Sequence, residues 1–113
     1  TGAGEFVQAS SQEDGKFGLL APTEPSYTIH NVTKEDTDGG REGHIIFKGK
    51  QSGGELTTLA RIVASHDGTS DDQKGNLIFY NNSGALGDSP AETMRIDSAG
   101  NVGIGTGTIA ATP

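Results

Sequence analysis

Three consecutive residues, Ser65, His66 and Asp67, are of the types that form the catalytic triad of serine hydrolases. In that triad the serine is the nucleophile, the histidine is its general base and the aspartate orients the histidine. Consecutive side chains of an extended chain point to opposite sides, so residues adjacent in sequence cannot form this relay. We therefore predict a polar turn leading into Gly68, with a site assembled across chains as the alternative. The chain is expected not to be an enzyme.

The acidic residues raise the question of a cation site. The run Asp36–Gly39 is similar to part of a calcium-binding loop, which supplies oxygen ligands at alternating positions. The pattern fails at its first position, which is Lys34, and at its twelfth, which is Ile45. A second acidic run, residues 67–72, has no recognised ligand spacing. We expect acidic surface turns at both places, and a weak divalent-cation site at residues 67–72 is the alternative.

Other residues that could hold a cofactor form no complete motif. The histidines are well separated, with no His-x-His pair, although a threefold ring of one of them could complete part of a metal shell. The glycine-rich run 103–107 lacks both the dinucleotide-binding pattern and a Lys-Ser/Thr pair, so it is not expected to cradle phosphate. No cysteine is present, which excludes disulfides and thiolate chemistry. We expect no cofactor and no metal.

The composition limits how the elements around these residues can pack. Only 31% of the 113 residues are hydrophobic, 18 are glycine and none is tryptophan. Such a chain has difficulty burying enough apolar surface alone, so it is either partly disordered or buried against other chains. The regular apolar pattern described below favours burial against other chains.

The net charge of the chain is −7, and its basic residues do not cluster. Affinity for nucleic acid depends on lysine and arginine meeting phosphates, so we expect no nucleic acid partner. No apolar run approaches the roughly 20 residues of a membrane span, so we also expect no membrane insertion.

Alternation of apolar and polar residues predicts short strands separated by long loops that are rich in glycine and aspartate. The expected strands are Phe17–Leu20, Tyr27–Asn31, His44–Phe47, Leu59–Ala64, Leu77–Tyr80, Met94–Asp97 and Val102–Ile104. One window is ambiguous, because the apolar residues of Glu55–Ala64 fit a helical spacing as well as a strand.

An internal repeat decides this window. Gly43–Phe47 matches Gly75–Phe79, 32 residues later, and Arg61-Ile62 matches Arg95-Ile96, 34 residues later. Met94–Ile96 is followed so closely by turn residues that a strand suits it best, which favours a strand at Leu59–Ala64 as well. Repeats of this length are typical of stacked architectures whose units cannot bury their faces singly.

The most specific motif lies near the end of the chain. The run Glu92–Thr106, which contains the sequence MRIDSAGNVGIGT, resembles an MRIDSxGNVGIGT element that recurs in tail-fibre and tail-spike proteins of tailed bacteriophages, especially marine ones. The block from Ser26 to Thr106 joins this resemblance, and residues 1–25 match less distinctly.

This resemblance implies a fibrous homotrimer, an all-β fold in which short strands build a triple-stranded β-helix or a β-prism-like shaft. Residues 1–25 would be an entry segment or joint, and 26–106 the shaft block with repeat units at about 43–69 and 75–106. Residues 107–113 would link to a further module. The residues expected in the interior of the trimer are Ile45, Phe47, Leu77, Phe79, Met94, Ile96, Val102 and Ile104. Gly103 and Gly105 would let symmetry-related strands pack closely.

The function expected from this resemblance is structural. The chain would be a segment of a virion appendage that trimerises and supports or presents host-receptor binding. Its partners would be further copies of itself and other fibre or baseplate proteins, with a host-surface glycan or protein as a further partner. The alternatives are a receptor- or glycan-binding module, in which the loops at 36–43 and 65–75 make the contact, and a polysaccharide-degrading spike domain.

Overall fold

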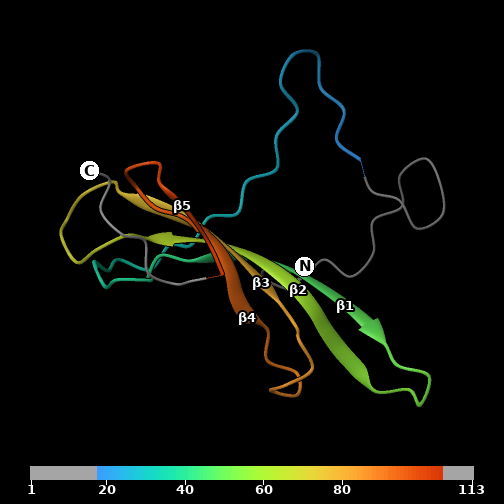
Figure 1. Cartoon of the computed structure of the whole chain (residues 1–113). Helices are drawn as coiled ribbons and strands as arrows, with labels where there is room; N and C mark the ends of the chain where they lie inside the picture. The colour runs from blue at the N-terminus through green and yellow to red at the C-terminus, as the bar shows by residue number, and fades with distance from the viewer. Residues whose placement is uncertain (1–17, 106–113) are drawn as a thin grey trace.

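The computed structural model describes residues 18–105, which form one antiparallel β-sheet of five strands and contain no helix (Figure 1). The strands are β1 (Gly43–Lys50), β2 (Leu56–His66), β3 (Gly75–Asn81), β4 (Ala91–Ile96) and β5 (Val102–Ile104). Each strand pairs with the next along the chain, so the order across the sheet is β1-β2-β3-β4-β5. The expected all-β class is confirmed.

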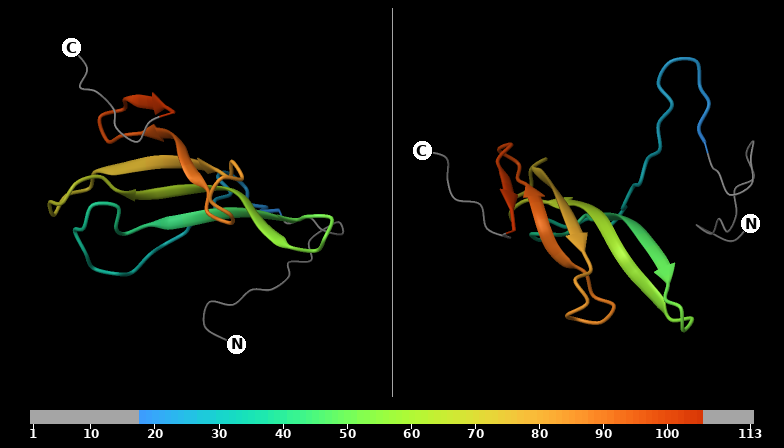
Figure 2. Two further views of the ribbon diagram at one scale, coloured as in Figure 1. Left: turned by 60° about the horizontal axis from the view of Figure 1, so that its bottom comes forward. Right: turned by 45° about the vertical axis from the view of Figure 1, so that its right-hand side comes forward.

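The connections alternate between the two ends of the sheet. We call the end formed by residues 51–55 and 82–90 the turn end, and the end formed by residues 34–42, 67–74 and 97–101 the clasp end. The strands twist along their length, as Figure 2 shows. Within the described residues, β1 and β5 each have a neighbouring strand on one side only.

The β1–β2 and β3–β4 hairpins are equivalent in register. Ile45 pairs with Ile62 in the first hairpin, and Leu77 pairs with Ile96 in the second. In both, the register shifts directly after the phenylalanine that ends the repeated sequence, which marks a β-bulge at the same place. The sequence repeat thus corresponds to two hairpins of the same geometry, joined through the β2–β3 pairing.

The expected strands from His44 onward are confirmed. The ambiguous segment Leu59–Ala64 is the middle of β2, so the helical alternative is wrong. His44–Phe47 and Leu77–Tyr80 lie inside longer strands, and Val102–Ile104 has the expected bounds. The strand expected at Met94–Asp97 begins earlier and ends one residue sooner, at Ile96.

The two strands expected before residue 32 are wrong for the described part of the chain. Residues 18–20 and Tyr27–Asn31 belong to no strand, and Phe17 lies outside the described residues. A strand needs backbone hydrogen bonds to a second strand. Ile29 and Asn31 instead contact the start of β1 through their side chains, Ile29 against Gly43 and the Asn31 amide with the carbonyl oxygen of Glu42. Alternation alone therefore does not make a strand here.

The sheet is a single layer, and this limits its core. Among the described residues, Val63 and Ile78 are the only buried apolar side chains, with exposed fractions of 5% and 4%. The radius of gyration of the Cα atoms is 17.1 Å, compared with about 13 Å for a compact domain of 100 residues. Stable domains pack at least two layers around their core, and the described part of the chain supplies no second layer for this sheet.

Candidate functional site

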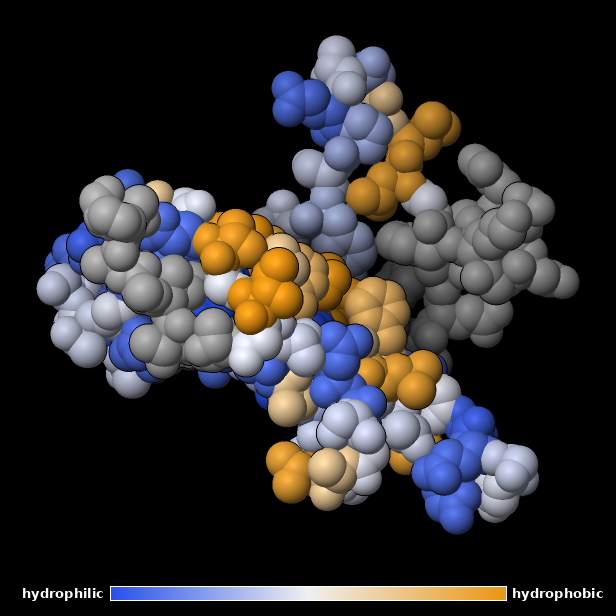
Figure 3. Space-filling view, viewed as in Figure 1, coloured by the Kyte–Doolittle hydropathy of each residue, from blue (hydrophilic) through white to orange (hydrophobic). Residues whose placement is uncertain are grey.

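The register of the sheet gathers apolar side chains on one face, which we call the apolar face. Directly paired residues of neighbouring strands have their side chains on the same face, about 4.5–5.5 Å apart. One row crosses all five strands, and a second row runs beside it. The apolar face consists of Ile45, Phe47, Ala60, Ile62, Ala64, Leu77, Phe79, Met94, Ile96, Val102 and Ile104. Figure 3 shows apolar side chains in a band across the strands.

All the residues that the sequence predicted for the interior lie on this face. Four of them, on the outer strands, remain exposed in the single chain. Their exposed fractions are 47% for Ile45, 49% for Phe47, 51% for Val102 and 77% for Ile104. The apolar face carries no charged side chain over the length of its two rows, so it is suited to contact with another apolar surface.

On the opposite face, which we call the polar face, side chains of the sheet itself cover the apolar residues at the centre. Val63 and Ile78 pair across β2 and β3 and are flanked by longer polar residues. The guanidinium of Arg61 lies 4.2 Å from the ring centre of Tyr80, and Arg95 forms two hydrogen bonds of 2.8 Å with Glu92. The aliphatic stems of such residues cover apolar neighbours while their charged ends stay in water.

The bulge in the β3–β4 hairpin makes the Arg95–Glu92 contact geometrically available. Without a bulge, residues three apart in a strand would lie on opposite faces. Because Tyr80 pairs with Glu92 while Phe79 pairs with Met94, one residue of β4 is skipped and both charged side chains reach the polar face. The hydrogen bonds that Arg95 donates to the Glu92 carboxylate raise the pKa of Arg95 above its usual value.

At the clasp end, His66 is the most deeply buried large side chain of the described chain, with 2% exposed. Its Nδ1 lies 3.3 Å from the carbonyl oxygen of Thr37, and its Nε2 lies 3.0 Å from Oδ1 of Asp72. A carbonyl and a carboxylate only accept hydrogen bonds, so both ring nitrogens donate when His66 is an imidazolium. The hydrogen bond to Asp72 is the main cause that raises the pKa of His66, against the opposing effect of desolvation.

Arg41 ties the two long loops of the clasp end together. Its Nε donates to the carbonyl oxygen of Glu35 at 2.6 Å, and its Nη1 donates to that of Asp72 at 2.7 Å. Its Nη2 forms an ion pair of 2.5 Å with Asp36. Arg41 is held at φ 55°, a left-handed conformation that is uncommon for residues other than glycine. We call the side chains Arg41, His66 and Asp72 the clasp.

The clasp shows why Ser65, His66 and Asp67 do not form a relay. The Ser65 hydroxyl donates to Oδ1 of Asn76 at 2.6 Å, on the polar face, whereas His66 points to the loops. Asp67 accepts a hydrogen bond from the backbone N–H of Ser98 at 2.9 Å. The side chain of Ser98 and then this N–H lower the pKa of Asp67. Ser65 and His66 are the last residues of β2, so the expected polar turn begins only at Asp67.

Acidic residues of the clasp end also form hydrogen bonds and ion pairs within the chain. Asp36 pairs with Arg41, and Asp38 accepts from the backbone N–H of Gly68 at 2.7 Å. Within residues 18–105, no three histidine, aspartate or glutamate side chains are arranged to hold a metal ion. Hydrogen bonds join the loops 34–42 and 67–74 at this corner of the sheet.

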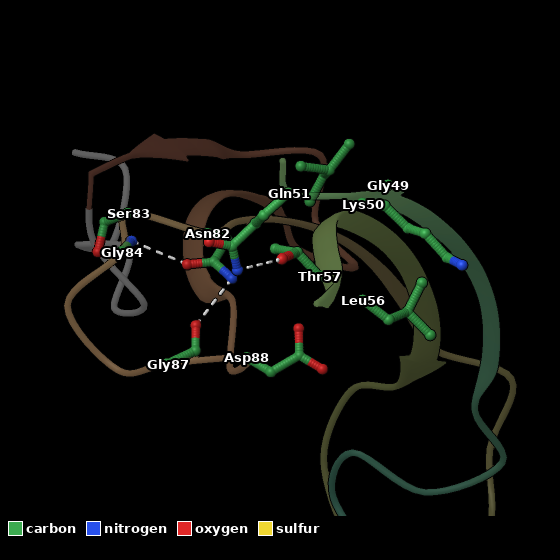
Figure 4. A pocket seen from close by; sticks show the side chains of 11 residues that line it. Gly49, Lys50, Gln51, Leu56, Thr57, Asn82, Ser83, Gly84, Gly87 and Asp88 are labelled. Atoms are coloured by element: carbon green, nitrogen blue, oxygen red, sulfur yellow. Dashed lines mark hydrogen bonds between the residues drawn. The ribbon is translucent and has the colours of Figure 1, made fainter. Parts of the chain in front are cut away.

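The turn end carries an open groove of about 690 Å³ between the β1–β2 turn and residues 82–88. Figure 4 shows Asn82 at its centre, with hydrogen bonds to the backbone of Gly84 and Gly87 of 2.8 and 3.0 Å. The same amide donates to the carbonyl oxygen of Thr58 at 3.0 Å, and Asp88 accepts from the backbone N–H of Thr58. These polar groups hold the loop against β2, and no aromatic ring lines the groove.

Sequence reasoning missed two features of these sites. Ile62 belongs to the apolar face, and its equivalence with Ile96 in the repeat was the signal that would have found it. The clasp joins Arg41 to Asp72, residues 31 positions apart, and no local pattern indicates such a contact.

Gly103 lies buried in β5, and Gly105 has a φ of 76°, which requires glycine for its backbone conformation.

No family model matches the chain, and no curated protein matches it. No helix among residues 18–105 has the length and hydropathy needed to cross a membrane.

Proposed function

We propose that this chain is a structural segment of a bacteriophage fibre, in which copies associate through their apolar faces around a common axis. The observation that carries the proposal is the row of apolar side chains that crosses all five strands and has no second layer among residues 18–105. Burial of each large apolar side chain contributes about 1.5–3 kcal/mol. An assembly therefore supplies the core that the single chain lacks.

The similarity of Glu92–Thr106 to phage fibre elements supports three copies and a place in the virion, in a tail fibre or another external appendage. Three sheets with their apolar faces inward enclose a triangular core. Every strand here pairs with a strand of its own chain. That pairing favours a β-prism of three sheets over a triple-stranded β-helix, whose strands alternate between chains.

The function of such a segment is mechanical: it holds a receptor-binding part away from the particle and connects it to other fibre or baseplate proteins. We do not extend the proposal to glycan binding or glycan cleavage. The groove at the turn end uses Asn82 and Asp88 to hold its own loop, and the carboxylates of the clasp end bond to Arg41, His66 and backbone N–H groups.

The mass of the native assembly in solution tests this proposal. Light scattering on the size-exclusion peak should give three times the chain mass of 11.6 kDa, independent of concentration over the working range. A folded species of 11.6 kDa would overturn the proposal, because the apolar face would then be stable in water. A species of twice that mass would retain the apolar interface and overturn the threefold arrangement.

A further inference from the structure

The two long loops of the clasp end each contain an aspartate followed directly by glycine, at Asp38–Gly39 and at Asp67–Gly68. In this dipeptide the glycine nitrogen can attack the side-chain carboxyl of the aspartate, because glycine has no Cβ to hinder the approach. A third such pair, Asp14–Gly15, lies outside the described residues. Each of the two described pairs therefore places a nucleophile and an electrophile in adjacent residues.

The reaction of such a pair is an isomerisation that needs only water. The glycine nitrogen bonds to the side-chain carbonyl carbon of the protonated aspartate, and the amide hydrogen and the carboxyl hydroxyl leave as one water molecule. A water molecule then opens the resulting five-membered imide. Where it attacks the backbone carbonyl, the chain continues through the former side chain and the product is isoaspartate. The composition is unchanged, and the main chain is one methylene group longer.

At Asp67–Gly68 both reacting groups are already held by other parts of the chain. The N–H of Gly68 donates to Oδ1 of Asp38 at 2.7 Å. The Asp67 carboxylate accepts from the backbone N–H of Ser98 at 2.9 Å. The side chain of Ser98 and then this N–H lower the pKa of Asp67, so less of the protonated electrophile is present. The nitrogen and the carboxyl group are thus directed to different partners.

At Asp38–Gly39 the two reacting groups are held across the clasp end. The N–H of Gly39 donates to the carbonyl oxygen of His66 at 2.9 Å. The Asp38 carboxylate is the acceptor for the N–H of Gly68. This one hydrogen bond between Asp38 and Gly68 therefore engages the electrophile of the first pair and the nucleophile of the second.

We propose that Asp38–Gly39 and Asp67–Gly68 are coupled sites of isoaspartate formation, kept unreactive by the hydrogen bonds that join the loops of the clasp end. In isoaspartate the free carboxylate is attached directly to Cα. Isomerisation of Asp38 therefore removes the acceptor from its place beside the Gly68 N–H and releases the nucleophile of the second site. This covalent change occurs within one chain and does not depend on the proposed assembly.

Peptide mass spectrometry with electron-transfer fragmentation, which distinguishes isoaspartate from aspartate, measures the protection. Full-length native protein is incubated in neutral buffer and then digested with trypsin. Free peptides of residues 35–41 and 62–74, the tryptic fragments that contain the two sites, give the unprotected rates in the same buffer. Each site should react about tenfold or more slowly in the native protein, because the hydrogen bonds across the clasp end must open first. A rate equal to that of the free peptide at either site would overturn the proposal.

An Asp38→Ala variant measures the coupling. It removes the acceptor of the Gly68 N–H, so isoaspartate at Asp67 should form about three- to tenfold faster than in the wild type, the effect of losing one hydrogen bond. The matched control is Asp71→Ala, which removes an exposed carboxylate from the same loop and should leave the rate at Asp67 unchanged. An unchanged rate in Asp38→Ala would overturn the coupling.

Fragmentation of the intact wild-type chain after incubation gives the same answer without a variant. Isoaspartate at position 67 should be enriched in molecules that already carry it at position 38. Independent occurrence of the two modifications would contradict the coupling.

Discussion

The two faces of the sheet carry similar apolar residues at their centres and differ in what lies beside them. On the polar face, Val63 and Ile78 are buried among Arg61, Tyr80 and Arg95. On the apolar face the row from Ile45 to Ile104 contains apolar residues alone, and its polar neighbour Asn81 lies beside Ala60. The comparison teaches that arginine and tyrosine side chains can cover one face of a single-layer sheet, whereas an apolar face must pack against another element to be buried.

The largest expected effect comes from the centre of the apolar face. Phe79 pairs with Ile62 on one side and with Met94 on the other. Replacing it with alanine, Phe79→Ala, should reduce the free energy of unfolding of the assembly by about 3–5 kcal/mol, because a core ring is lost. The reduced melting temperature should rise again with protein concentration. A concentration-independent loss would place Phe79 in a core that the monomer already completes.

A smaller effect is expected at the centre of the polar face. Ile78→Val removes one methylene group next to Val63 and should cost about 0.5–1.5 kcal/mol in the free energy of unfolding. Because this site is buried within one chain, with 4% exposed, the mass of the assembly should stay unchanged. Light scattering and thermal unfolding of the same sample measure both quantities. Dissociation of Ile78→Val would show that the polar face also takes part in association.

The smallest effect is expected at the clasp end, which lies outside both faces. The stability of this end depends on pH through the titration of His66 and Asp72. The pKa of His66 is raised above 6.5, so its contribution to stability is full below pH 6.5 and is lost as pH rises through the folded value. The pKa of Asp72 is lowered below 3.8, so its contribution is full above pH 3.8 and is lost as pH falls through the folded value. The clasp is therefore most stable between these limits.

Amide exchange at Gly39 and His66, whose backbone N–H groups bond across the clasp end, measures this dependence. Exchange corrected for its intrinsic pH dependence should accelerate above the pKa of His66, and a His66→Asn variant should lose this pH step. The mass of the assembly should remain constant over the same range. A change of mass with the titration of His66 would mean that the clasp, and not the apolar face alone, controls association.

The sequence was a good guide to the sheet from residue 43 onward, and the physical reason is local. Alternation fixes which residues share a face, and the repeat of Gly43–Phe47 at Gly75–Phe79 gives both hairpins the same register. Alternation failed at Tyr27–Asn31, because a strand also requires backbone hydrogen bonds to a second strand, whereas Ile29 and Asn31 contact residues 42–43 through their side chains. The clasp depends on the fold of two loops, and neither loop alone indicates that Arg41 reaches Asp72.

The pattern of apolar residues does not determine how many copies of the chain associate. An uncovered apolar face requires a second surface, but two sheets could cover each other as three can. Only the similarity of the run ending at Thr106 to phage fibre elements indicates three.

Ile45 and Ile46 provide the most direct test of the apolar face. They are adjacent in β1, are the same residue type and have exposed fractions of 47% and 49%, yet they lie on opposite faces. Light scattering of full-length Ile45→Asp and Ile46→Asp compares a buried charge in the proposed interface with a charge on the polar face. We expect Ile45→Asp to have the mass of one chain and Ile46→Asp to have the mass of the wild-type assembly. Equal masses for the two variants would contradict association through the apolar face.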